Sequence, residues 1–185
     1  MRIAVVDDSS LVLDVVREAL ERAGFVVTCA RDTDEALRAD ADLLVADASL
    51  RARLPVDKLR VLNKEDGLGR SLSRAVGGVV AVSGPLMTRY RARFYVLARR
   101  RLARALDLFE GIVGGGIEEL ARELQTMTGE AQLLELHEFA ELAQSAEAHV
   151  LEWVSRGEFA DLTRFAQRLN TMCVALHGLL TLPDR

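Results

Sequence analysis

Ile3-Ala4-Val5-Val6-Asp7-Asp8 is the stretch that decides the fold of this chain. A short, continuous apolar run that ends in acidic residues is typical of a central parallel strand buried on both faces. The pattern returns at Leu43-Leu44-Val45-Ala46-Asp47. Because ligand sites of open parallel sheets lie beyond the carboxyl ends of their strands, we expect Asp7, Asp8 and Asp47 to share one pocket.

Strand and helix patterns alternate on either side of these two runs. Ser9 or Ser10 can cap a helix that ends near Gly24, and further helices are expected over 34–39 and 70–76. Strands are expected over 25–30, 58–62 and 79–82. The alternation predicts an α/β fold with a five-stranded parallel sheet and flanking helices.

The second half of the chain is expected to be all-α. Residues 87–113 contain no Pro and a single Gly, which predicts one long helix leaving the sheet. Helices follow over 117–134, 137–155 and 158–180, with breaks at Gly114-Gly115-Gly116 and Gly157. We therefore predict a sheet domain over 1–86, whose last helix continues to about residue 113, and a helical bundle over 87–185 that shares the long helix.

Composition favours a protein with two compact units. The 185 residues are 50% hydrophobic and 28% charged, with a net charge of −4, which gives no global sign of nucleic-acid binding, membrane association or disorder. Cys29 and Cys173 lack a metal-binding or disulfide spacing. No signal peptide and no apolar stretch of about 20 residues is present, so we expect a cytoplasmic protein.

Three converging carboxylates repel one another unless a hard cation such as Mg²⁺ joins them. The simpler alternative is that one of these carboxylates is a helix N-cap and another is an ordinary acidic residue of a loop.

Val5-Val6-Asp7-Asp8-Ser9-Ser10 and Asp42-Leu43-Leu44-Val45-Ala46-Asp47 resemble the receiver domains of response regulators. The resemblance covers residues 1–47 and implies that Asp47 is the phospho-acceptor and that Asp7 and Asp8 help it to hold Mg²⁺.

The resemblance weakens beyond Asp47. The family has a Ser or Thr after the fourth strand and a Lys before a Pro after the fifth, whereas this chain has Asn63 and Gly84 there. The segment up to Pro85 is also short enough to shrink or delete the third helix. Lys58 or Lys64 could supply the missing ammonium from a neighbouring loop, but solvated lysines are the default expectation.

The helical half resembles a histidine phosphotransfer (Hpt) domain that has lost its histidine. Residues 124–131, Leu-Gln-Thr-Met-Thr-Gly-Glu-Ala, place Gln125 at the phospho-histidine position and Thr128 at that of a lysine. An amide cannot act as the phosphoryl nucleophile. The same region suggests a partner-binding face comprising Glu118, Gln125, Thr128 and Glu130. His137, His149 and His177 lack the family's spacing and are interpreted as ordinary histidines.

These patterns favour a non-catalytic two-component signalling adaptor that binds a histidine kinase, a receiver or a related regulator. A phospho-accepting response regulator switched at Asp47 is the first alternative. A DNA-binding regulator is the second, because seven arginines lie between Arg89 and Arg104, although they face several sides of the helix. No nucleophile and base pair indicates an enzyme. We further expect no membrane partner, and a homodimer through the helices fits the pattern.

Overall fold

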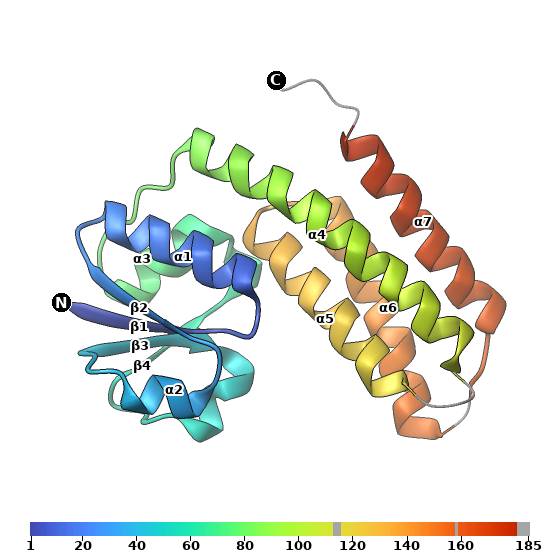
Figure 1. Cartoon of the computed structure of the whole chain (residues 1–185), viewed down its shortest axis with the longest axis horizontal. Coiled ribbons are helices and arrows are strands. Elements are labelled where there is room, and N and C mark those ends of the chain that lie inside the picture. Colours follow the sequence, from blue (N-terminus) through green and yellow to red (C-terminus); the bar gives the residue numbers. More distant parts are fainter. Residues whose placement is uncertain (113–115, 158, 181–185) are drawn as a thin grey trace. The chain divides into compact units, whose positions relative to one another are not determined.

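The computed structural model describes residues 1–112, 116–157 and 159–180 (Figure 1). The chain divides into two compact units. The α/β unit comprises Met1–Arg91 and Gln132–Glu135, and the helical unit comprises Ala92–Ala131 and Leu136–Arg185. Helix α4 (Gly84–Glu110) begins in the α/β unit and ends in the helical unit.

The α/β unit contains a four-stranded parallel sheet in the order β2-β1-β3-β4. Its strands are β1 (Arg2–Val6), β2 (Val26–Ala30), β3 (Leu43–Asp47) and β4 (Leu59–Leu62). Val6 of β1 pairs with Ala46 of β3, and Asp47 pairs with Leu62 of β4. The residues that follow β1 and β4 therefore lie at the same sheet edge as Asp47. The predicted parallel α/β sheet is confirmed, with four strands.

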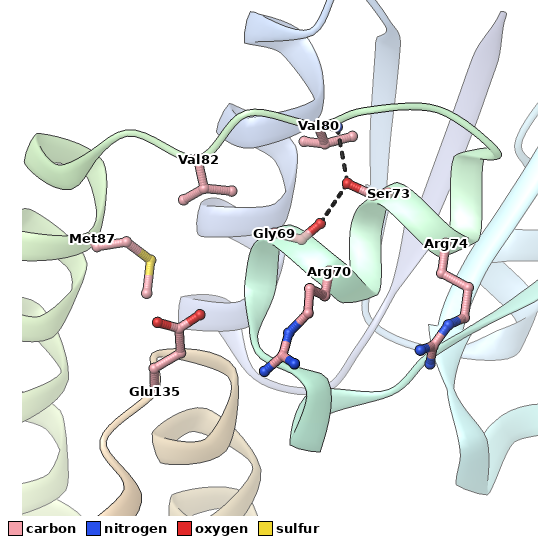
Figure 2. Close-up of a pocket in the computed structure, with 8 residues that line it drawn as sticks. All are labelled: Gly69, Arg70, Ser73, Arg74, Val80, Val82, Met87 and Glu135. Atoms are coloured by element: carbon pink, nitrogen blue, oxygen red, sulfur yellow. Dashed lines mark hydrogen bonds between the residues drawn. The ribbon is translucent and has the colours of Figure 1, made fainter.

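The prediction of a fifth strand over residues 79–82 is wrong. Residues 79–82 form neither a strand nor a helix and pair with no strand of the sheet, and Val79 is 92% exposed. The backbone N–H of Val80 donates to Ser73 Oγ at 3.0 Å, and that hydroxyl donates to the Gly69 carbonyl at 2.7 Å (Figure 2). The Ser73 hydroxyl on helix α3 (Leu68–Val76) thus accepts the Val80 N–H, a backbone donor that a fifth strand would have used to pair with β4.

Helices cover both faces of the sheet (Figure 1). Helices α1 (Ser10–Arg22) and α3 lie on one face, and the short helix α2 (Thr33–Arg38) lies on the other. Helix α1 begins where Ser9 Oγ accepts the Val12 N–H at 3.2 Å, the cap expected from the sequence. The α2 face is lined largely by small side chains, which let the helix approach closely: Ala4, Ala30, Ala36, Ala41 and Ala46.

Short 3₁₀ helices replace longer elements near the carboxyl edge of the sheet. One, η1 (Ala48–Arg53), follows β3, and the other, η2 (Lys64–Asp66), follows β4. The stretch between β3 and β4, described throughout, contains no α-helix, in line with the shortening predicted from the sequence.

The helical unit contains the rest of α4 with α5 (Ile117–Leu133), α6 (His137–Arg156) and α7 (Leu162–Leu180). Each helix buries one apolar stripe, which in α5 is Leu120, Leu124, Met127 and Ala131 and in α7 is Phe165, Leu169, Met172 and Leu176. This spacing of three and four residues is why the helices form against one another. Trp153 of α6 lies against Phe109 of α4 and Phe165 of α7.

The helix ends differ from the prediction in places. Helix α4 begins and ends about three residues earlier than expected, at Gly84 and Glu110, and Val113, the expected last residue, lies outside the described residues together with Gly114 and Gly115 of the proposed break. Gly157 caps α6 with a φ of 69°, as a left-handed C-terminal glycine does. Glu158, the expected start of the last helix, also lies outside the described residues. Among the described helices, none is long and apolar enough to cross a bilayer.

Candidate acidic pocket and its lysine

Asp7 and Asp47 lie at the carboxyl edge of the sheet because β1 and β3 are adjacent and parallel. Asp7 is 2% exposed, and its Oδ1 accepts the Ser9 N–H at 2.9 Å. Asp47 is half-buried, and its Oδ1 accepts the Ser49 N–H at 2.9 Å, which caps η1. In each carboxylate, one oxygen is held by the backbone and Oδ2 remains for a cation.

That cation is the ammonium of Lys64. Its Nζ lies 2.8 Å from Asp7 Oδ2 and 3.2 Å from Asp47 Oδ2. The lysine side chain is 15% exposed, whereas that of Asp7 is 1% exposed. The expectation that Lys64 is solvated is therefore wrong. We call this cluster of Asp7, Asp47 and Lys64 the acid–lysine triad.

A local turn brings Lys64 into the triad. Lys64 is the first residue of η2 and follows the end of β4 after a single residue, Asn63, so its backbone lies at the carboxyl edge of the sheet. The Lys64 carbonyl accepts the Gly67 N–H at 3.1 Å, and Asn63 Nδ2 donates to Asp66 Oδ2 at 3.1 Å. Gly67 has a φ of 75°, a conformation that glycine adopts without strain. The turn thus fixes the base of the lysine side chain.

The pKa shifts of the triad favour the charged forms of Lys64 and Asp47, whereas the pKa of Asp7 is shifted toward the neutral acid. Burial would lower the pKa of Lys64, but the two carboxylates outweigh it and the pKa is raised. Burial alone would raise the pKa of Asp47, yet Lys64 and the Ser49 N–H hold it below its usual value. Burial keeps the pKa of Asp7 raised, although Lys64 and the Ser9 N–H offset part of the effect. Asp7 is therefore the member that depends most on the lysine to stay ionised.

The residues present do not fit the Mg²⁺ site that the receiver resemblance implies. The space between Asp7 Oδ2 and Asp47 Oδ2 contains Lys64 Nζ. Asp8, the third expected ligand, is exposed to solvent. Within the described ranges, no three acidic, histidine or cysteine side chains are grouped as metal ligands. The expected metal triad is thus replaced by two carboxylates and a lysine.

The expected switch positions do not enter the triad. Asn63 is exposed, and its amide is committed to Asp66. Gly84 does not follow a strand, because the fifth strand is absent, and is instead the exposed first residue of α4. Lys58 lies at the other end of β4, where its Nζ donates to the Ala41 carbonyl at 3.1 Å. Ser49 was not predicted, and no signal in the sequence distinguished it from other loop serines.

The expected partner face divides into exposed and buried residues. Gln125 and Glu118 of α5 are exposed. Thr128 is 6% exposed, and its hydroxyl donates to the Leu124 carbonyl at 3.0 Å. Glu130 is 1% exposed and lies 3.2 Å from an Arg101 nitrogen. Thr128 and Glu130 therefore contribute to the inside of the helical unit, and the face available to a partner is centred on Glu118 and Gln125.

Several arginines of α4 are engaged with carboxylates. Arg101 contacts Glu123 at 3.1 Å as well as Glu130, and Arg104 contacts Glu119 and Glu123. In the α/β unit, Arg89 contacts Glu18 of α1. Binding of nucleic-acid phosphates through these arginines would require breaking such pairs. The acidic partners of Arg101 and Arg104 lie on α5 and that of Arg89 lies on α1, so the sequence alone did not indicate the pairing.

His149 is a buried core residue, whereas the sequence favoured an ordinary surface or partly buried histidine. It is 8% exposed, and its ring lies 4.8 Å from that of Trp153. Arg168 lies 2.6 Å from Nδ1 and can act only as a donor, so Nδ1 is the acceptor. Nε2 then carries the proton and donates to the Ala160 carbonyl at 3.3 Å. Both ring nitrogens are thus engaged, so the imidazole has no free nitrogen to offer as a nucleophile.

Comparisons with protein-family models, curated proteins and solved structures gave no match to this chain.

Proposed function

We propose that the chain is a non-catalytic adaptor of two-component signalling, in which a degenerate receiver-like unit is joined to an Hpt-like helical bundle that lacks the phospho-histidine. It acts by binding a histidine kinase, a receiver or a related regulator. The parallel order β2-β1-β3-β4, with Asp7 and Asp47 at one edge, supports the receiver resemblance. The exposed position of Gln125 on α5 supports the Hpt resemblance.

The acid–lysine triad is the observation that carries this proposal. A phospho-acceptor needs a free carboxylate oxygen and compensation for the incoming phosphoryl charge. Here Asp47 Oδ2 is paired with Lys64 and Oδ1 with the Ser49 N–H. Lys64 is shared with Asp7, so its charge already compensates carboxylates. Such a pocket is suited to holding β1, β3 and η2 in one arrangement rather than to switching between two.

The proposed binding face of the helical unit contains Glu118 and Gln125. An exposed amide at a phospho-histidine position can hydrogen-bond to an acceptor pocket without transferring a phosphoryl group. Adaptor action would then consist of occupying the surface that a phosphotransfer partner normally uses. Homodimerisation through the helices stays a prediction.

The first experiment tests phosphoryl acceptance. The full chain is incubated with Mg²⁺ and a small acyl phosphate, and intact mass is measured with Asp47→Ala as the control. We expect little stable acyl phosphate in either protein, because the acceptor oxygen is ion-paired. Stoichiometric modification that disappears in Asp47→Ala would contradict the proposal.

The second experiment tests the binding face with purified partners. Affinity for the phosphotransfer domains of histidine kinases and for receivers from the same cell is measured by calorimetry. Gln125→Arg is expected to weaken a detected interaction by about tenfold or more, as an uncompensated charge in an interface does. Gln144→Arg, at an exposed glutamine of α6, is the control for the same added positive charge. Equal effects of the two variants would place the interface elsewhere.

A phospho-accepting regulator remains the second candidate because Lys64 reaches Asp47. An ammonium 3.2 Å from the acceptor carboxylate could pair with phosphoryl oxygens if it released Asp7. The labelling experiment separates the two candidates, since only this one requires a stable modification at Asp47.

A further inference from the structure

We propose that Lys64 is the permanent cation of the acidic pocket and excludes divalent metal ions from it. The inference deepens the proposed adaptor function and rests on it in one respect, namely that the pocket fixes a surface instead of transferring a phosphoryl group. It assigns Lys64 a role that Mg²⁺ has in the family that residues 1–47 resemble.

Geometry provides the first argument. Mg²⁺ binds carboxylate oxygens at about 2.0–2.1 Å in a nearly octahedral shell that includes several waters. Lys64 Nζ is in contact with Asp7 Oδ2 and Asp47 Oδ2, the two oxygens that the backbone does not hold. An ion that bridged these oxygens would have to occupy the position of the ammonium. A metal ion that bridges Asp7 Oδ2 and Asp47 Oδ2 and the observed lysine position are therefore mutually exclusive.

Charge provides the second argument. Two carboxylates and one ammonium leave the triad with little negative charge to attract a further dication. Asp8 could add a third carboxylate only by leaving the solvent-exposed position that it occupies. If Mg²⁺ entered while Lys64 stayed, two cations would be in contact in a largely buried site, which is strongly unfavourable. The ion would therefore have to expel the lysine first.

The turn around Lys64 opposes that expulsion. The Lys64 carbonyl is bonded to Gly67, and the Asp66 N–H donates to the Asn63 carbonyl at 3.2 Å. Asp66 is also held from α3 by Arg74. Since the backbone is tied on both sides of the lysine, the ammonium can leave only by side-chain rotation away from its two carboxylates. The lysine is thus a built component of the pocket.

The experiment compares metal binding by the full chain and its variants. Mn²⁺ binding is followed by electron paramagnetic resonance, and the melting midpoint is recorded with and without Mg²⁺. We expect wild type to bind no Mn²⁺ at micromolar concentrations and to show no Mg²⁺ shift. Lys64→Met should bind Mn²⁺ at least tenfold more tightly, and Mg²⁺ at ten times its dissociation constant should raise the midpoint by roughly 3 °C or more.

Two further variants are controls. Lys64→Arg keeps a cation in the pocket and should remain insensitive to metal. Lys58→Met removes a lysine at the opposite end of β4 and should behave as wild type. If Lys64→Met fails to fold, wild type and Lys64→Arg still decide the matter, because tight Mn²⁺ binding by wild type that is lost in Asp7→Asn would overturn the proposal.

Failure of this inference differs from failure of the proposed function. Mn²⁺ binding by wild type without modification of Asp47 would contradict metal exclusion alone. Stable modification of Asp47 in metal-free buffer would contradict the adaptor function alone. A Lys64→Met protein that folds but binds Mn²⁺ no better than wild type would also contradict the assigned role of Lys64.

Discussion

Removal of the Lys64 charge should destabilise the α/β unit strongly, because it leaves the Asp7 carboxylate buried without a cation. The Asp7 side chain is 1% exposed and that of Lys64 15%. Breaking a buried ion pair on one side typically costs about 3–5 kcal/mol, a large share of the roughly 5–15 kcal/mol that stabilises a domain. We expect Lys64→Met to lower the free energy of unfolding by about this amount at pH 7.

A double-mutant cycle isolates the charge effect. Asp7→Asn keeps an Oδ1 that can accept the Ser9 N–H, the bond that measures 2.9 Å in wild type. Together with Lys64→Met it removes both charges, so the double variant should be more stable than Lys64→Met alone. We expect a coupling of about 2–3 kcal/mol between the two sites.

Urea unfolding followed by circular dichroism measures both quantities, with unchanged slopes as evidence that the unfolded state is the same. A loss below about 1 kcal/mol in Lys64→Met, beneath the range for a broken buried pair, would refute the reasoning. So would additive effects in the double variant, because they would mean that Lys64 and Asp7 do not interact.

Three more predictions concern the titration of Lys64, the contacts of Arg101 and the helix cap at Ser9. The folded-state pKa of Lys64 is raised above the ordinary lysine value of about 10.4. The stabilisation that the Lys64 ammonium provides is therefore complete below about pH 10.4 and is lost as the pH rises through the folded-state pKa. Urea midpoints measured between about pH 9 and 11.5 should fall more in wild type than in Lys64→Arg. Arg101→Met should lower the free energy of unfolding by about 1.5–3 kcal/mol, since it removes the charged contacts of Arg101 with the buried Glu130 carboxylate and with Glu123, and an unchanged urea midpoint would contradict this. Ser9→Ala should cost about 1 kcal/mol by removing the cap of the Val12 N–H, with Ser10→Ala as the control that should cost less.

Strands β1 and β3 were predictable because each contains four consecutive apolar residues, the pattern of a strand that is buried on both faces. A strand covered on both faces tolerates no polar position, and the run ends where the chain leaves the sheet. The carboxyl-edge position of Asp7 and Asp47 followed from parallel pairing alone. The limits of α1 and α6 were also close, because Ser9 and Gly157 carry recognisable capping chemistry.

The fifth strand could not be excluded by local pattern. Val79-Val80-Ala81-Val82 has strong strand propensity, but a strand forms only if an edge accepts its N–H and C=O groups. In this chain Ser73, six residues upstream of Val79, presents a hydroxyl that captures the Val80 N–H. That contact depends on how α3 lies beside residues 79–82, and the hydrophobic periodicity of the sequence does not indicate this arrangement.

The position of Lys64 was missed for a related reason. A lysine after a strand is ordinarily solvated, since burial of an ammonium is costly unless carboxylates compensate. Whether the chain turns inward or outward after Leu62 depends on η2, whose 3₁₀ turn needs the left-handed conformation of Gly67. Gly67 was the one sequence feature that pointed to this turn, because a glycine three residues after a lysine permits the chain to turn back tightly.

Buried ion pairs in both units bear on the proposed function. The triad of Asp7, Asp47 and Lys64 and the contact of Arg101 with Glu130 both bury charges that apolar side chains could replace at little loss of stability. Their effect is to penalise alternative arrangements, since any rearrangement that separates the partners weakens the compensation of a buried carboxylate. A switch requires two arrangements of similar free energy, whereas an adaptor requires one. Under the proposed function, a pocket that carries its own cation keeps the binding surface constant whatever the supply of metal or phosphodonor.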